Sequence, residues 1–140
     1  MRIFTLFILT LLLNNCSGQN MKPIDFKDQK PRLIIEDYLS GHVKAWGLLQ
    51  NRSGKVTRQF SADLNGQWDG KQLILNEKFN WSDGEVQKRQ WKIIKLDEHN
   101  YEGTADDVVG KAKGQSYGPA FKFEYVLLVP VKGKEIKITF

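Results

Sequence analysis

Apolar and polar residues alternate along most of the chain after His42. Runs of about ten residues, rich in aromatic and branched aliphatic side chains, are separated by short polar segments that contain glycine. The alternation is clearest over residues 73–81, 121–129 and 136–140, where every second position shares one face. A period of two is typical of strands that bury one face. The pattern therefore predicts antiparallel strands joined by hairpins.

Short polar segments predict where the strands end. Two of them contain Asp-Gly pairs, which suit the positive φ of tight hairpins. The predicted turns are 51–54, 68–71, 82–85, 97–100 and 131–134, with a looser turn near 114–118. A short helical turn is predicted only at 36–39, and no amphipathic stretch long enough for a crossover helix follows it. A parallel α/β fold is therefore excluded.

Six or seven sequential strands with inward aromatic side chains predict an all-β fold. We expect an antiparallel up-and-down meander that forms a lipocalin-like barrel or a strongly curled sheet, because closure removes exposed strand edges. The chain ends at Phe140 inside a strand pattern. Two expectations follow: either the last strand pairs directly, or the chain is truncated at its C-terminus.

The N-terminal residues predict export and lipid attachment. Arg2 precedes an apolar run at 3–13, which is shorter than the ~20 residues of a membrane-spanning helix. We interpret residues 1–15 as a bacterial signal peptide and Cys16, the only cysteine, as the acylated first residue of a lipoprotein. Asn15 stands where a small residue is usual, so the alternative is an ordinary signal peptide that ends nearby, with Cys16 either removed or left as a free thiol.

Acylation would fix the protein to the cell envelope, because two or three acyl chains anchor far more firmly than one. Ser17, rather than an aspartate, favours the outer membrane, with the protein facing the periplasm. Residues 16–31 are predicted to form a polar tether, and residues 32–140 a single β-barrel-like domain. One cysteine cannot form an internal disulfide, so the fold depends on its hydrophobic core.

Charge and composition exclude several classes of function. The chain has 21 Lys and Arg against 16 Asp and Glu, interspersed rather than gathered, so no nucleic-acid partner is expected. With only His42 and His99 and no catalytic, metal-binding or nucleotide-binding motif, we expect neither an enzyme nor a cofactor.

Five segments together carry a family resemblance: 41–47 (GHVKAWG), 68–70 (WDG), 75–77 (LNE), 83–85 (DGE) and above all 101–110 (YEGTADDVVG). The chain resembles the proteobacterial lipoproteins of domain of unknown function 3833. This resemblance implies a signal that ends at cysteine, a β-barrel, further strands beyond Phe140 and no stated activity. Genes of the family often lie beside those of fatty-acid-modifying enzymes, which directs the expected ligand towards lipid.

Three charged positions are candidates for polar contacts inside the barrel. Glu77 lies on the apolar face of the strand predicted at 73–81. Asp106 and Asp107 are adjacent, and on a strand one of the two would point inwards. An inward carboxylate needs a partner, which is either a basic residue such as Arg89 in a structural salt bridge or the head of a ligand.

Aromatic residues would line the interior, either as a cavity wall or as packed core. The leading hypothesis is non-enzymatic binding of an apolar or lipid-like small molecule, with its polar head at Arg89, Asp106 or Glu77. The alternatives are a periplasmic interaction scaffold and an enzyme that acts on envelope lipid or glycan through the inward carboxylates. The predicted lining residues are Trp46, Trp81, Phe123 and Tyr125.

Overall fold

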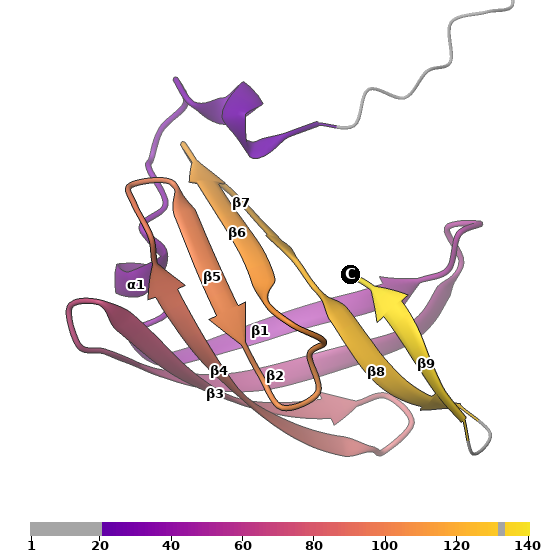
Figure 1. Ribbon diagram of the computed structural model, residues 1–140. Helices are drawn as coiled ribbons and strands as arrows, with labels where there is room; N and C mark the ends of the chain where they lie inside the picture. The colour runs from indigo at the N-terminus through magenta and orange to yellow at the C-terminus, as the bar shows by residue number, and fades with distance from the viewer. Residues whose placement is uncertain (1–20, 132–133) are drawn as a thin grey trace, which may run out of the picture.

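The computed structural model describes residues 21–131 and 134–140, so the predicted signal peptide and Cys16 lie outside the described residues. Seven strands form one antiparallel sheet in chain order, and two more form a separate hairpin (Figure 1). The strands are β1 (Gly41–Gln50), β2 (Val56–Trp68), β3 (Gln72–Trp81), β4 (Val86–Lys95), β5 (Asn100–Thr104), β6 (Ala112–Tyr117), β7 (Ala120–Glu124), β8 (Val126–Val131) and β9 (Lys134–Thr139).

The first four predicted turns are confirmed, each between two consecutive strands. In the two Asp-Gly turns, Gly70 and Gly84 have φ of 98° and 87°, a conformation that glycine adopts without steric cost. Asp69 Oδ1 accepts hydrogen bonds from the backbone N–H groups of Lys71 (2.9 Å) and Gln72 (2.7 Å). The aspartate side chain thereby fixes the turn that sets the register of β2 against β3.

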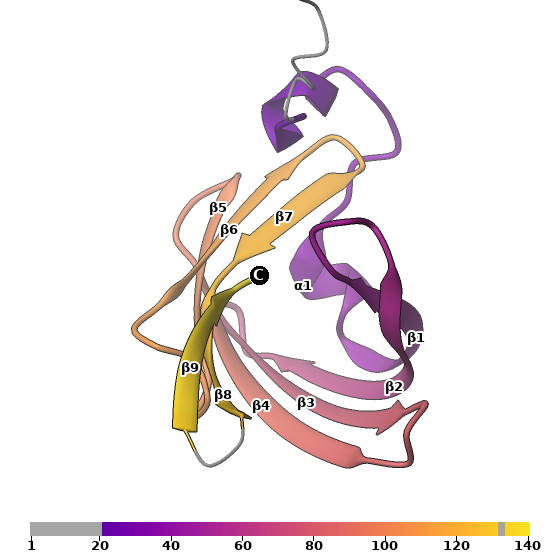
Figure 2. The same ribbon diagram turned by 90° about the vertical axis from the view of Figure 1, so that its right-hand side faces the viewer.

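The seven-stranded sheet curls through half a barrel, which confirms the all-β, strongly curled fold (Figure 2). Alternate residues of each strand face the concave side, as the sequence pattern predicts. The buried core lies on this side, and its members are Ile35, Ala62, Leu64, Leu73, Leu75, Trp91, Ile93, Tyr101 and Ala112.

One short helix, α1 (Ile35–Tyr38), matches the predicted helical turn and covers one end of the concave side (Figure 2). Its buried Glu36 accepts hydrogen bonds from Lys95 Nζ and from the Tyr101 hydroxyl (2.9 Å). Burial raises the pKa of Glu36, but the bonds from Lys95 and Tyr101 outweigh it and leave that pKa below its ordinary value. We refer to Glu36, Lys95 and Tyr101 as the α1 clasp.

The segment before α1 also contacts the sheet. The 3₁₀ turn η2 (Pro23–Phe26) lies against β6 and β7, and the backbone N–H of Leu33 donates to the Gly118 carbonyl (2.8 Å). These contacts begin before Arg32, where the sequence predicts the domain to start. No helix in the described part of the chain is long and apolar enough to cross a membrane.

Three details of the strand prediction are wrong. The strand predicted over 121–129 breaks at Tyr125, because its backbone N–H and C=O bond to Phe140 (3.1 and 2.9 Å) and not to β6. The looser turn near 114–118 falls only at Gly118, since Gly114 lies within β6. The apolar positions predicted at 136–140 are not fully buried: Ile136 of β9 is 41% exposed, Ile138 is half-buried, and Phe140, which follows β9, is 40% exposed.

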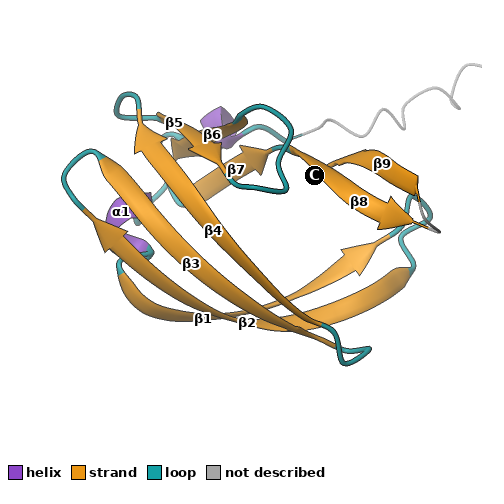
Figure 3. Cartoon of the chain, turned by 60° about the horizontal axis from the view of Figure 1, so that its bottom comes forward, coloured by secondary structure: helices purple, strands orange, loops and turns teal. Residues whose placement is uncertain are grey.

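The hairpin of β8 and β9 reaches the main sheet through a short connection (Figure 3). Val108 forms an isolated bridge with Leu127, and the backbone N–H of Val109 donates to the Val126 carbonyl (2.8 Å). The turn that carries Asp106 and Asp107 therefore lies between β5 and the hairpin.

Candidate functional site

The concave face divides into a packed half and an open half. Under α1 the inward side chains form the buried core, whereas towards the β3–β4 turn they are only partly buried. In this open half the ring of Phe60 lies 5.3 Å from Phe79 and 5.1 Å from Trp81, measured between ring centroids. The result is an aromatic surface that the described residues leave partly uncovered.

Arg89 is a buried cation at the boundary between the two halves. Its side chain is 8% exposed and faces inwards from β4, in register with Glu77 of β3. It donates to the Asp107 carboxylate from Nη2 (2.7 Å) and from Nε (3.0 Å). This two-point geometry is the strong form of an arginine–carboxylate pair.

The aspartate that pairs with Arg89 is Asp107, while Asp106, the aspartate predicted to meet the polar head, lines the cleft beside Arg89 together with Asp107. Both residues lie in a turn after β5 ends at Thr104, so the alternation expected of a strand does not apply. Asp106 is exposed, while Asp107 turns towards Arg89. The structural salt bridge with Arg89, one of the two interpretations of the pair, is therefore present, and Asp107 makes it.

Glu77 faces inwards, as predicted, and is a carboxyl group with an unusual pKa. Trp91 Nε1 donates a hydrogen bond to its Oε2 (3.2 Å). Burial raises the pKa of Glu77 to about 7; Arg89 and the Trp91 hydrogen bond oppose this rise, and Asp107 adds to it. Glu77 therefore changes its charge near neutral pH.

Phe123 and Tyr125 lie beside this charged group. Their ring centroids are 5.0 and 5.2 Å from Trp91, both in edge-to-face geometry. Burial raises the pKa of the Tyr125 hydroxyl, which the nearby Arg89 guanidinium opposes. Both residues belong to the concave face, as the sequence predicts.

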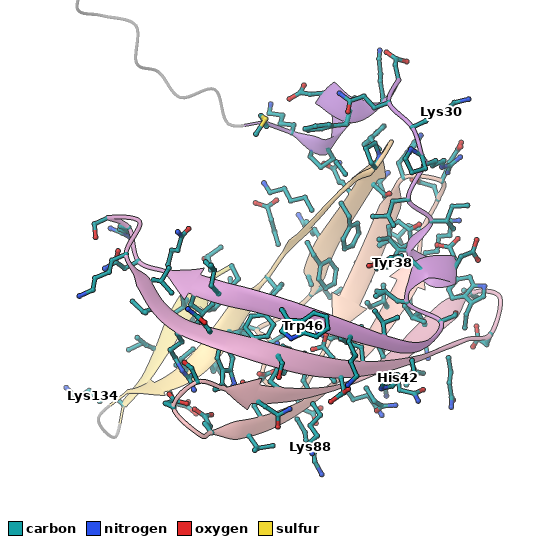
Figure 4. All side chains as sticks on the ribbon, turned by 180° about the vertical axis from the view of Figure 1, so that it is seen from behind. Lys30, Tyr38, His42, Trp46, Lys88 and Lys134 are labelled. Carbon is teal, nitrogen blue, oxygen red and sulfur yellow. The ribbon has the colours of Figure 1, made fainter. Side chains whose placement is uncertain are left out.

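Of the two predicted lining tryptophans, only Trp81 faces inwards. Arg58 stacks on its ring, 4.1 Å from the centroid, and also pairs with Asp83 and Glu85. Trp46 is 74% exposed on the outer side of β1, where Figure 4 labels it. The prediction for Trp46 is wrong, because Val43, Ala45 and Gly47 take the inward positions of β1.

A cleft of about 510 Å³ opens beside Arg89. β5 pairs only with residues 92–95 of β4, which leaves the edge of the preceding residues, from Val86 to Trp91, without a neighbouring strand. Glu77, Arg89 and Asp107 line the cleft from the concave side, and Lys78 and Lys88 from the convex side. The charged group is therefore reachable from solvent.

The sequence did not predict two features of the concave face, the inward Arg58 and the α1 clasp. Arg58 follows the inward alternation of β2 and could have been found from it, since Phe60 and Ala62 continue the same face. The α1 clasp has no local signal, because Glu36 and Tyr101 are 65 positions apart. Within residues 21–131 and 134–140, no group of three or more His, Cys, Asp or Glu side chains could hold a metal ion.

Comparison with known proteins identifies the family to which the chain belongs. A family model described as a protein of unknown function, DUF3833, matches residues 10–140. The chain belongs to this family. The DUF3833 match confirms the resemblance carried by the 101–110 segment, and it assigns no activity. No curated protein and no solved structure matches the chain.

Proposed function

We propose that this DUF3833 protein is a lipoprotein of the bacterial envelope whose domain binds an apolar or lipid-like small molecule and does not transform it. One observation carries the proposal: the open half of the concave face presents aromatic side chains that are only partly buried, next to a buried charged group. Curled sheets with this combination suit ligands that have an apolar body and a polar end.

The apolar body would lie on the aromatic surface. Phe60, Phe79 and Trp81 form one cluster there, and covering their exposed area stabilises a complex by about 25 cal/mol per Å². The ring of Trp81 is held by the stacked Arg58 guanidinium, so part of this surface is ordered before a ligand arrives.

The polar end would lie at Arg89 and Glu77. Both are inward, in register and within the cleft, and they lie on the core side of the aromatic cluster. Hydrogen-bonding groups placed beside an apolar surface fix the orientation of an amphipathic ligand. Attachment through Cys16 would hold the domain at the outer membrane, where it faces the periplasm.

Mass spectrometry of what co-purifies tests the proposal. The chain would be expressed with its signal in a bacterial host and purified both as the wild type and as Cys16→Ser, so that anchor lipid is distinguished from cargo. We expect one class of apolar molecule, near one per chain, in both forms. A preparation without cargo that also fails to bind added amphiphiles would overturn the proposal and favour a scaffold.

One observation supports an enzymatic alternative: the pKa of Glu77, about 7, suits general acid–base chemistry. Asp107 is committed to Arg89, so Asp106, which lines the same cleft, would be the second carboxyl group of such an enzyme. Conversion of the co-purified molecule by the wild type but not by Glu77→Gln would establish the enzyme.

A further inference from the structure

The polar end of the site restricts the chemistry of its ligand. We infer that the head of the bound molecule carries no negative charge and donates a hydrogen bond to Glu77, as a hydroxyl group does. This inference rests on the proposed function and goes further, because it excludes carboxylate and phosphate heads.

At the boundary of the open half, two described acids, Asp107 and Glu77, lie beside one base, Arg89. Arg89 commits Nε and Nη2 to Asp107, and that pair is neutral. Glu77, in register with Arg89, is a second carboxyl group that shares the same guanidinium. An anionic head would be a third acid beside one buried cation, and like charges in such a site oppose each other strongly.

Among the residues that the structure describes, no side chain facing Glu77 other than Arg89 supplies a positive charge. β2 contributes the apolar Leu64, its register partner, and β4 contributes Trp91 beside Arg89. The Asp106–Asp107 turn contributes Asp107, and Tyr125 is a neutral hydroxyl. Lys78 and Lys88 also line the cleft, but they face the convex side, where both are exposed and water screens them.

The hydrogen-bonding groups beside the cleft fit a hydroxyl head. Trp91 donates to Oε2 of Glu77, so Oε1 lies outside that bond, and Nη1 of Arg89 lies outside the pair with Asp107. Glu77 and Arg89 both line the cleft, and the Tyr125 hydroxyl lies within hydrogen-bonding reach of the same guanidinium. A hydroxyl head can donate to the Glu77 carboxylate and accept from Arg89, whereas a carboxylate or phosphate head supplies no donor and adds a negative charge beside Glu77.

Three amphiphiles that share one alkyl tail separate the possibilities: dodecanol, dodecanoate and dodecylammonium. Each would be titrated into the full chain carrying Cys16→Ser at about pH 8, where Glu77 is ionised, with tryptophan fluorescence as the readout. We expect dodecanol to bind about ten-fold more tightly than dodecanoate, and dodecylammonium to bind at least as tightly as dodecanol.

Glu77→Gln, in the same chain, removes the unmatched negative charge and keeps an acceptor for Trp91. In this variant we expect dodecanoate to gain about ten-fold in affinity, while dodecanol changes less than about three-fold. Glu124→Gln is the matched control, because Glu124 is an exposed acid of β7 that pairs with Lys122. It should leave all three affinities unchanged.

The outcomes separate this inference from the proposed function. If all three amphiphiles bind but dodecanoate equals or exceeds dodecanol, the inference is wrong and the binding function stands. If none of the three binds to the folded protein, both fail together.

Discussion

Arg89 shows how one buried cation can organise a site. Its side chain is largely buried but lines the cleft, and its guanidinium is held at two points by Asp107 and lies 5.9 Å from the Phe79 centroid and 5.8 Å from the Trp91 centroid. Removing a charge from water is costly, and the pairing must offset that cost. The pair therefore restrains the turn that carries Asp107 as well as the arginine itself.

Two adjacent aspartates allow a direct test of this pair. Asp107→Asn leaves the buried guanidinium without its counter-charge, and we expect the free energy of unfolding to fall by about 2 kcal/mol, less than for a fully buried pair because Asp107 is one-third exposed. Asp106→Asn should change it by less than about 0.5 kcal/mol. Urea unfolding of the two variants measures both, and equal effects would contradict the assignment.

Glu77 makes stability depend on pH in a predictable direction. Its pKa is 4.5 ordinarily and about 7 in the fold, so the folded protein binds the proton more tightly. The resulting stabilisation is complete below pH 4.5 and is lost as the pH rises through about 7.

The variant Glu77→Gln separates the contribution of Glu77 to this pH dependence from that of the other acids. Relative to Glu77→Gln, we expect the wild type to lose about 2 kcal/mol of unfolding free energy between about pH 5 and about pH 8. Urea unfolding at several pH values provides the measurement. A constant difference between the two proteins across this range would show that Glu77 titrates normally.

For single residues, the sequence predicts the direction of a side chain only where one face of a strand is clearly apolar. β3 meets that condition, so the inward positions of Glu77 and Trp81 follow from the pattern. β1 has apolar residues on both faces, and the large Trp46 occupies the solvent face while Ala45 occupies the inner one. Asp107 lies in a turn, where only its tertiary partner determines its direction.

The elements themselves follow the sequence more closely than the side chains do. Alternation and Asp-Gly turns are local, and they predict β1 to β4 well. The break at Tyr125 could not be predicted, because it depends on backbone pairing with Phe140, 15 positions away (140 − 125). For the same reason, the separation of β8 and β9 from the main sheet has no local signal.

Replacing each of two adjacent acids of α1, Glu36 and Asp37, tests how this helix is attached to the sheet. Glu36→Ala leaves Lys95 and the Tyr101 hydroxyl without their partner, and we expect a loss of about 3 kcal/mol in unfolding free energy. Asp37→Ala, at an exposed position, should cost less than about 0.5 kcal/mol. Thermal or urea unfolding distinguishes them, and a small effect of Glu36→Ala would mean that α1 is held by Ile35 alone.

At the scale of the whole molecule, the sheet and the β8–β9 hairpin are two units joined by few contacts. The hairpin reaches the rest through the Val108–Leu127 bridge, a few backbone hydrogen bonds and the stacked rings of Tyr125 and Phe140. Segments with few buried contacts open at lower free energy than the core.

Native-state hydrogen exchange should therefore resolve two classes of amide. We expect β8 and β9 to exchange through local opening, at a free energy several kcal/mol below that of β2 and β3. The amides that pair β2 with β3, from Phe60 to Trp68, are the internal reference. Equal protection of the hairpin and this reference would show that the molecule opens only as a whole.

The chain-order pairing of the main sheet has a consequence for folding speed. Every strand from β1 to β7 pairs only with its neighbours in the chain, so each hairpin can close over a short loop before the next one forms. Distant contacts come from the N-terminal segment, in which α1 and its neighbours contact β4, β5 and β6, and η2 lies against β6 and β7. The sheet can thus zip up strand by strand, and the closing of its N-terminal cover is the step with the largest loop entropy to overcome.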